Sequence, residues 1–547
     1  MTPTTGPRDC EHGGIGESAM TSPPAAISRP LPDLTTLRQA VDRGDTRPEG
    51  WRRRQLEALA NLIETHEQEI LQALADDLGK PELEGMVEIL ALRQELKLCR
   101  RQLRRWMRPR RVAVPLAQQP GRAEVMREPL GCVLIIGPWN YPFHLTLQPL
   151  ISALAAGNTA VVKPSEQAPA TAALISRLLP LHLPGDVVQV VEGDGAVAAA
   201  LIDQGYDHIF FTGGGAIGAR VLAGAARHLT PVTLELGGKS PAVVLEGADL
   251  AVTARRLIWG KGLNAGQTCI APDHLLVQDS IREALLEALA QARRELYGDA
   301  PLQSPDLARI INPRQYERLE RLLDGARDAG QVLIGGESDA ASRRIAPTVL
   351  QVSDDDDPLM AEELFGPLLP LLSVASLEEA IARIRRQAKP LALYLFGGHA
   401  QEQQALLNGT SSGGVCFNDV VMQVGVPDLP FRGCGPQRHG HVSRRSGVPH
   451  LLPRTVRAAP PLRSGCPPAL PALPGEARLA QASARLRLTP DWVGGTGIGW
   501  RDWHPWRGTL WFAQPTETHA PHLRCRPGPD GSAAAAGHGS QCHREAR

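Results

Sequence analysis

The sequence predicts an α/β protein, in which short buried strands alternate with helices along two long stretches of the chain. Between residues 131 and 236, short apolar runs alternate with segments whose apolar residues recur at helical spacing. Repeated strand–helix–strand units favour a parallel sheet that is covered by helices on both faces. A second α/β stretch runs from Pro241 to about Phe417, and 547 residues are enough for two such domains.

The expected elements follow in order along the chain. Residues 37–105 carry apolar side chains at steps of three and four, and Gly79 with Pro81 predicts that a helix ends there. Residues 112–126 predict two strands around a turn at 119–121, and hence a β-hairpin. We expect strands at 132–136, 160–162, 187–191, 208–211 and 232–236, and helices at 149–156, 168–179, 196–201, 217–227, 281–297 and 314–329.

The composition excludes several classes of protein. Lys+Arg and Asp+Glu both total 58, so the formal net charge is zero, which argues against a dedicated nucleic-acid binder. No apolar run is long enough for a transmembrane helix, and residues 1–30 lack the apolar core of a secretory signal. We therefore expect a cytoplasmic protein that binds no membrane, with a disordered segment at 1–32. The nine cysteines show no metal-ligand spacing, so no metal site is expected.

The densest chemical signal is the segment Gly262-Leu-Asn-Ala-Gly-Gln-Thr-Cys269. Small residues around a cysteine allow a substrate to approach the backbone closely. A cysteine alone is more often a buried apolar residue than a nucleophile, so its context matters. Upstream, Glu235 ends a predicted strand beside a glycine turn, and Asn140 lies in a rigid turn after another strand. Ligands gather at strand ends in α/β folds, which favours a catalytic cysteine.

At these three motifs the sequence resembles the aldehyde dehydrogenase superfamily, and it is most similar to the class 3 branch that includes coniferyl-aldehyde and fatty-aldehyde enzymes. The resemblance runs from about Leu37 to Phe431. Supporting stretches lie at 163–166, 210–218, 229–235, 363–367 and 412–418. The resemblance implies a Rossmann-type cofactor domain at 33–235, an α/β catalytic domain at 236–418, and a β-hairpin at 112–128 that serves oligomerisation in a homodimer.

The resemblance also implies a role for each residue of the three motifs. Cys269 as thiolate adds to the carbon of a small-molecule aldehyde, and covalent catalysis divides the reaction into two steps. The Asn140 amide and the Cys269 backbone N–H stabilise the oxyanion. Hydride then leaves for the nicotinamide, and Glu235 acts as the general base that activates water to release the acid. The plain alternative for Glu235 is a surface carboxylate at the end of a strand.

The cofactor residues follow from the resemblance as well. The glycine segment that contains Thr212, Gly213 and Gly218 is similar to the family's cofactor loop, although it lacks the G-x-G-x-x-G pattern and carries Gly214 where many relatives have serine. Lys163 resembles the residue that binds the adenosine ribose, and the nearby carboxylate of Glu166 favours NAD, with NADP as an alternative. The remaining residues in the predicted cofactor site are Trp139, Glu363 and Phe365.

The chain departs from the family after Phe431. Relatives continue with a segment like Ser-Gly-Met-Gly-x-Tyr-His-Gly-Glu-Ala-Gly-Phe-x-Thr-Phe-Ser-His, whereas residues 432–453 differ. Residues 437–453 can be encoded by a DNA stretch that, read one base later, gives Ser-Gly-Met-Gly-Thr-Tyr-His-Gly-Glu-Ala-Gly-Phe-Arg-Thr-Phe-Ser. We therefore hypothesise a one-base frameshift, which makes 419–431 the remnant of the family's ending and 432–547 an out-of-frame, disordered tail.

Two alternatives to an acid-forming dehydrogenase stay open. A CoA-acylating relative would pass the acyl group to CoA, although such relatives typically lack the general base that Glu235 resembles. A catalytically defective dinucleotide-binding protein is the second alternative, because the altered ending of the chain removes residues that support substrate loops and subunit contacts in the family.

Overall fold

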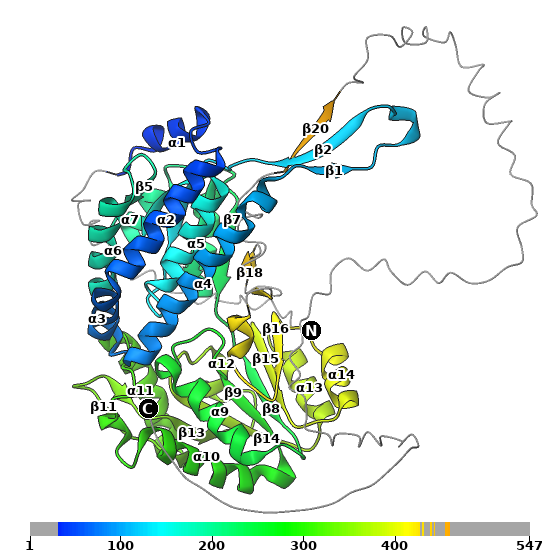
Figure 1. The fold of residues 1–547 in the computed structure, drawn as a ribbon. Coiled ribbons are helices and arrows are strands. Elements are labelled where there is room, and N and C mark those ends of the chain that lie inside the picture. Colours follow the sequence, from blue (N-terminus) through cyan, green and yellow to red (C-terminus); the bar gives the residue numbers. More distant parts are fainter. Residues whose placement is uncertain (1–30, 427–428, 432–437, 440–441, 444–453, 460–547) are drawn as a thin grey trace, which may run out of the picture. The chain divides into compact units, whose positions relative to one another are not determined.

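Two mainly parallel sheets with their helices form the fold, and a smaller antiparallel sheet is attached to the first of them (Figure 1). The computed structural model describes residues 31–426, 429–431, 438–439, 442–443 and 454–459, and all of these belong to the unit that spans residues 1–513. The predicted disordered segment falls outside the described residues, except for its last two positions. The arrangement confirms the predicted α/β class.

The first sheet contains five parallel strands and one short antiparallel strand. Its strands are β3 (Cys132–Ile136), β4 (Thr159–Lys163), β5 (Val188–Val190), β6 (His208–Gly213), β7 (Val232–Leu236) and β18 (Arg438–His439). They lie side by side in the order β18-β7-β6-β3-β4-β5. The five parallel strands thus follow the Rossmann order. Strands β4 and β5 are added on one side of β3, and β6 and β7 are added on the other side, so the order of the strands reverses between β3 and β6. A ligand crevice is expected at the carboxyl ends of these two strands.

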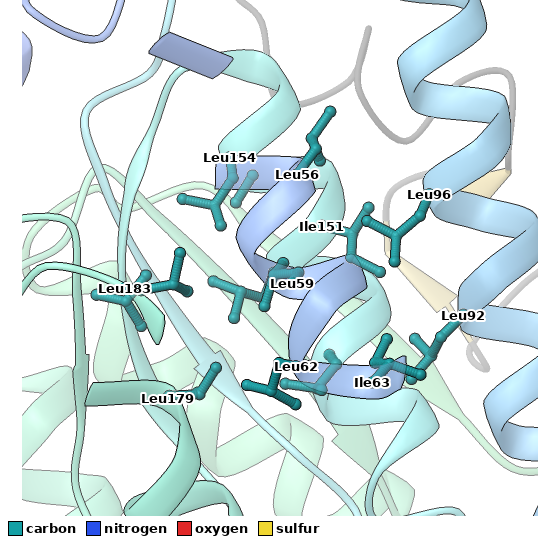
Figure 2. Close-up of a cluster of buried hydrophobic side chains, with 14 of the residues drawn as sticks. Leu56, Leu59, Leu62, Ile63, Leu92, Leu96, Ile151, Leu154, Leu179 and Leu183 are labelled. Carbon is teal, nitrogen blue, oxygen red and sulfur yellow. The ribbon is translucent and has the colours of Figure 1, made fainter. Parts of the chain in front are cut away.

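Helices of the N-terminal half pack around the first sheet. They are α1 (Leu34–Asp42), α2 (Glu49–Thr65), α3 (Glu67–Leu78), α4 (Glu82–Met107), α5 (His144–Ala156), α6 (Pro169–His182), α7 (Gly195–Ile202) and α8 (Gly215–Ala226). Leucine and isoleucine at steps of three and four give α2 an apolar face. Figure 2 shows this face, which includes Leu59, against side chains of α4, α5 and the end of α6, among them Leu92 and Ile151; all three of these residues are fully buried.

The second sheet belongs to the following part of the chain. Its strands are β8 (Pro241–Val244), β9 (His274–Gln278), β10 (Val332–Ile334), β13 (Thr348–Gln351), β14 (Leu368–Val374), β15 (Ala392–Phe396) and β16 (Gly414–Phe417). Their order is β10-β13-β14-β9-β8-β15-β16, and all but β10 are parallel. The helices of this part are α9 (Leu250–Gly262), α10 (Arg282–Tyr297), α11 (Pro313–Asp328), α12 (Pro358–Ala361), α13 (Leu377–Arg386) and α14 (Ala400–Gly409). Strands β11 (Ser338–Asp339) and β12 (Arg344–Ile345) form a separate pair.

The predicted hairpin is present with different bounds. Strand β1 (Arg110–Val112) begins before the predicted start, and it pairs antiparallel with β2 (Arg122–Arg127). The chain leaves the sheet after β1 because Pro115 has no N–H to donate, and a 3-10 helix follows at Leu116–Gln118. Helix α5 also begins before the predicted residue 149, since the structure accommodates Pro149 inside the helix.

The expectation that the chain has no regular structure after residue 431 is wrong for three short segments. Strand β18 pairs with β7, β19 (Val442–Ser443) pairs with β17 (Pro430–Phe431), and β20 (Arg454–Ala459) pairs with β2 over six positions. Strand pairing uses backbone groups that every residue except proline supplies, so a segment of unusual sequence can still form it. The rest of the predicted tail lies outside the described residues.

Candidate active site

One cavity of about 1080 Å³ opens at the carboxyl ends of β3, β4, β6 and β7. This is where the strand order of the first sheet predicts a ligand crevice. The sequence singled out eleven residues, and ten of them line this cavity: Trp139, Asn140, Lys163, Glu166, Thr212, Gly213, Glu235, Glu363, Phe365 and Cys269. Gly218 does not line it. A Cβ on Gly218 would lie 2.8 Å from Leu236 Cδ2, so this glycine lets α8 pack closely against β7.

Cys269 follows a sharply turned loop between α9 and β9. Asn264 and Ala265 both have a φ of 51°, in the left-handed region that non-glycine residues seldom adopt. Gly266 also has a positive φ, and a Cβ there would lie 2.2 Å from the Gly366 carbonyl oxygen. The loop therefore depends on glycine at 266, and it brings the partly buried Cys269 to the cavity wall.

The surroundings of Cys269 disfavour its thiolate. Burial, followed by the negative charge of Glu363, raises the pKa of the Cys269 thiol to about 12. Burial likewise raises the pKa of Glu363 to about 8, with the nearby charge of Asp273 adding to the effect. At neutral pH the carboxyl of Glu363 is mostly protonated in this geometry, and the cysteine is a thiol that must lose its proton before it can attack.

Asn140 lies in the loop after β3 and is almost fully buried. Its side-chain Nδ2 donates to the Gln267 carbonyl oxygen at 3.0 Å, which ties the amide to the loop before Cys269. An amide nitrogen carries two hydrogens, so the second remains for another acceptor. Next to it, the Tyr141 hydroxyl and the Thr268 hydroxyl are 2.7 Å apart and hydrogen-bonded. Both contacts join the turn after β3 to the cysteine loop.

Glu235 is the penultimate residue of β7, and its side chain is buried in the wall of the cavity. The turn that follows is built around glycine. A Cβ on Gly237 would lie 1.9 Å from Glu363 Oε2, so only glycine lets this carboxyl approach the end of β7. The glycine turn that the sequence placed beside Glu235 thus has a packing role as well.

Two contacts hold the loop that carries Glu363. Lys239 Nζ donates to Asp273 Oδ2 at 2.5 Å and to the carbonyl oxygen of Glu362 at 3.1 Å. The backbone N–H of Leu364 donates to Asp273 Oδ1 at 2.9 Å. Glu363 therefore sits between two anchored neighbours, which accounts for its fixed position over the cavity.

Aromatic and charged groups line the rest of the cavity. The rings of Trp139 and Phe365 meet edge to face, with centroids 5.2 Å apart. Lys163, the last residue of β4, is buried, and its Nζ donates to Glu166 Oε2 at 2.9 Å. Because Glu166 is partly exposed at 42%, the pair presents both a cation and a carboxylate at the edge of the cavity.

The glycines after β6 provide a test of whether a dinucleotide fits. Gly214 and Gly215 both line the cavity, and a Cβ on either would meet no protein atom within 4 Å. No packing inside the protein therefore requires glycine there. A backbone that a phosphate approaches closely at a helix N-terminus does require it, and α8 begins at Gly215. The described residues fit a nicotinamide dinucleotide at this position.

Sequence reasoning missed several residues around the cavity. These residues hold the catalytic loops through an ion pair or a hydrogen bond, and they are Lys80, Glu88, Gln267, Lys239 and Asp273. A charged residue beside Pro81 at a helix start and an acid two turns later were the available signals for the first two. Their pairing depends on the tertiary structure, because isolated charges are usually solvated. Among the described residues, no group of three or more His, Cys, Asp or Glu could hold a metal ion, and no helix could cross a membrane.

Comparison with known proteins agrees with this geometry. The model of the aldehyde dehydrogenase family matches residues 38–452, and so extends beyond Phe431, where we expected the resemblance to end. Aldehyde dehydrogenase family 3 member H1 of Arabidopsis thaliana is 44% identical over 74% of this chain and 84% of its own length. The human family 3 member B1 is 45% identical over 75% of this chain and 87% of its own.

A solved structure supports the same assignment. The substrate-bound aldehyde dehydrogenase of Staphylococcus aureus is 38% identical, with a TM-score of 0.78 over 82% of this chain and 98% of its own. The family match, the identity to family 3 members and the shared fold all concern the residues that build the cavity. This chain belongs to the aldehyde dehydrogenase family, and it is an oxidoreductase that acts on aldehydes with a nicotinamide dinucleotide.

Proposed function

We propose that the protein oxidises an aldehyde to the free carboxylic acid through a thioester on Cys269. The observation that carries this proposal is the placement of Cys269, Asn140 and Glu235 around one cavity, which also contains the open glycine backbone at 214–215. A nucleophile, an oxyanion donor and a carboxylate base are the three groups that oxidation followed by hydrolysis requires.

In the proposed mechanism, the Cys269 thiol gives its proton to water, and Sγ then attacks the carbonyl carbon. The new oxyanion accepts hydrogen bonds from Asn140 Nδ2 and from the backbone N–H of Cys269, which stabilises charge as it develops. The bound nicotinamide ring supplies the acceptor for the hydride that leaves the substrate carbon. Glu235 then takes a proton from water, the water oxygen attacks the thioester carbon, and the C–S bond breaks to release the acid and the thiolate.

For the cofactor, we propose NAD as the preferred form and NADP as an accepted one. Lys163 and Glu166 lie at the edge of the cavity, where the resemblance places the adenosine ribose. A carboxylate there favours a free 2′-hydroxyl and repels a 2′-phosphate, whereas the neighbouring lysine reduces that repulsion. One relative, a dimeric enzyme of Rattus norvegicus that is 44% identical, is described as NADP-preferring, so the preference must be measured.

For the substrate, we propose an apolar aldehyde, aromatic or aliphatic. Apolar side chains from α4 and from the segment after β16 line the cavity together with Cys269, among them Val87, Leu90 and Val424. Removing an apolar tail from water against such side chains stabilises binding, at about 25 cal/mol for each Å² buried.

For the assembly, we propose a homodimer that forms when the family's ending is intact. The hairpin of β1 and β2 supports an intermolecular role, because Leu116 in the turn between the two strands is 83% exposed. Contact with a second subunit would remove this side chain from water, which favours association.

The decisive experiment is a panel of aromatic and aliphatic aldehydes with NAD and NADP, run on this chain and on a version with the frame restored. Formation of the free acid without CoA supports the proposal, and formation of product only with CoA would identify a CoA-acylating enzyme instead. Dinucleotide binding without turnover in both versions would identify a defective dinucleotide-binding protein. The Glu235→Gln variant is the matched control, since it should retain the first, hydride-releasing turnover and lose steady-state acid release.

A further inference from the structure

Lys80, just before α4, and Glu84 and Glu88 in its first two turns lie beneath the two catalytic loops; Lys80 and Glu88 are buried, and Glu84 is partly buried. The side chains of Lys80 and Glu88 form an ion pair and are both 0% exposed. Lys80 Nζ also donates to the Asn140 carbonyl oxygen at 3.0 Å, and it lies 4.0 Å from the centre of the Tyr141 ring. Glu88 Oε2 accepts from the backbone N–H of His144 at 2.9 Å. The pair therefore holds the turn after β3 at two points.

Glu84 lies one helical turn before Glu88 and holds the other catalytic loop. Its Oε2 accepts from the backbone N–H of Asn264 at 2.8 Å. Asn264 is one of the two left-handed residues that turn the chain toward Cys269. Residues four apart share one face of a helix, so one face of α4 binds both the turn that carries Asn140 and the loop that carries Cys269.

The two loops also meet at a single atom. The Asn140 carbonyl oxygen accepts from Lys80 Nζ and, at 2.8 Å, from Asn264 Nδ2. The oxyanion donor and the loop that bears the nucleophile are thus linked through one backbone carbonyl, and α4 fixes both. A displacement at this junction changes the distance between the Asn140 amide and Cys269.

Stability alone does not account for a buried ion pair at this place. Removing two charges from water costs about as much free energy as their attraction returns, and replacing a buried pair by apolar residues is often neutral or stabilising. A fully satisfied polar network does fix the geometry of the groups it binds. Lys80 contacts the backbone of Asn140 and Glu88 contacts the backbone of His144, so the pair is bound to the turn after β3.

We propose that Lys80, Glu84 and Glu88 are positioning residues, which set the placement of the Asn140 amide relative to Cys269 in the oxidation step. The inference rests on the proposed function, because it assigns these residues an effect only through the oxyanion that Asn140 stabilises. None of the three needs to touch the substrate carbonyl for this role.

The first experiment is a double-mutant cycle in the full chain, with steady-state kinetics. The paired variant Lys80→Met/Glu88→Leu removes both charges and leaves neither partner buried alone. We expect kcat to fall roughly 10- to 100-fold with KM little changed, because displacing a catalytic group by about 1 Å has an effect of that size. In an Asn140→Ala background the same pair should cause almost no further loss. An equal loss in both backgrounds would overturn the proposal.

Two further variants separate positioning from a general loss of structure. Arg93→Met, also on α4, breaks the ion pair that Arg93 makes with Glu67 of α3, and it should leave kcat unchanged. Glu84→Gln should retain turnover, whereas Glu84→Ala should lose it. Burial raises the pKa of Glu84 to about 7, so a neutral side chain that still accepts the Asn264 N–H is close to the native state.

Hydrogen exchange gives a readout that does not depend on turnover. The backbone amide of His144 donates to Glu88, so it should exchange faster in the paired variant. The backbone amide of Asn264 donates to Glu84, so it should exchange faster in Glu84→Ala. Both should exchange at the native rate in Arg93→Met. Native exchange in every variant would refute the positioning role. If Asn140→Ala keeps full turnover while exchange changes as expected, the proposed oxyanion role of Asn140 fails and the structural tie stands.

Discussion

The reactivity of Cys269 depends on two neighbours that act in opposite ways on its environment. Burial and the charge of Glu363 raise the pKa of the thiol and so disfavour the attacking thiolate. The Asn140 amide, in contrast, is placed to donate a hydrogen bond to the oxyanion that forms after the attack. Both features come from side chains that meet only in the folded chain. Each therefore leads to a prediction about a single residue.

The substitution Glu363→Gln should make Cys269 easier to alkylate. Removing the carboxylate lowers the pKa of the thiol, so the thiolate fraction at a given pH rises. Because Glu363 has a pKa of about 8, it is mostly neutral below that pH and charged above it. The iodoacetamide rates of the variant and the native protein should converge below pH 8 and differ several-fold above it. Equal rates throughout the alkaline range would show that Glu363 does not act on the sulfur.

The substitutions Cys269→Ala and Asn140→Ala should differ in their severity. Without the sulfur no thioester forms, so aldehyde oxidation should fall to background in the frame-restored protein. Loss of one oxyanion donor should lower kcat by about 10²- to 10³-fold. Turnover measured as NADH formation checks both, and retained oxidation in Cys269→Ala would overturn the proposed nucleophile.

The residues that carry the chemistry could be predicted because they lie in short contiguous motifs. Asn140 follows one predicted strand and Glu235 lies at the end of another, and parallel strands bring their carboxyl ends to one edge of the sheet. Cys269 lies in the motif at 262–269, in the loop between α9 and β9. The residues that hold them could not be predicted. Lys80 lies just before α4 and contacts Asn140, which is 60 residues away in the sequence, and a single charged residue before a helix more often faces water.

Among the elements, the strands of the first sheet were predicted most closely. Strands β3 and β7 have the expected bounds. Strand β3 is buried on both faces and is a continuous apolar run between turn residues. Helix α5 and strand β1 deviate from the expected bounds at Pro149 and Pro115 respectively. In both cases the local preference of proline competes with the tertiary packing around it.

The apolar face of α2 supports a prediction about stability. Leu59 is 0% exposed and lies in the cluster that Figure 2 shows between α2 and its neighbouring helices. Leu59→Ala should lower the free energy of unfolding by about 2–5 kcal/mol, because the cavity it leaves cannot collapse fully. Leu181→Ala on α6 is the control, since Leu181 is 70% exposed and its loss should change stability by less than about 0.5 kcal/mol. Urea unfolding of both variants measures the difference.

For the whole molecule, the ending of the chain decides the assembly that we expect. Restoring the frame after Phe431 should convert the protein to a homodimer, whereas the chain with its present ending should have a smaller dimer fraction. Sedimentation at several concentrations measures this, and equal masses for the two versions would contradict the expectation. Sequencing the gene tests the frameshift itself, since codons that cannot encode the family's ending in the second frame would exclude it.

The structure after residue 431 could not be predicted from the pattern of side chains. Strand β20 pairs with β2 from Arg122 to Arg127, although the segment around it has no periodicity that indicates a strand. An available strand edge recruits backbone groups with little regard to sequence. The side-chain pattern of residues 454–459 therefore could not predict β20, because the edge of β2 determines the conformation of this segment.

The pairing of β20 has a consequence for recognition between molecules. Strand β2 has β1 on one side and β20 on the other, so both of its backbone edges are occupied within the same chain. In this sheet, as far as the structure describes it, another molecule can add a strand only beside β1 or beside β20. A second subunit that paired with the β2 edge now occupied by β20 would first have to displace the six residues of β20. The ending of the chain therefore competes with a second subunit for this edge.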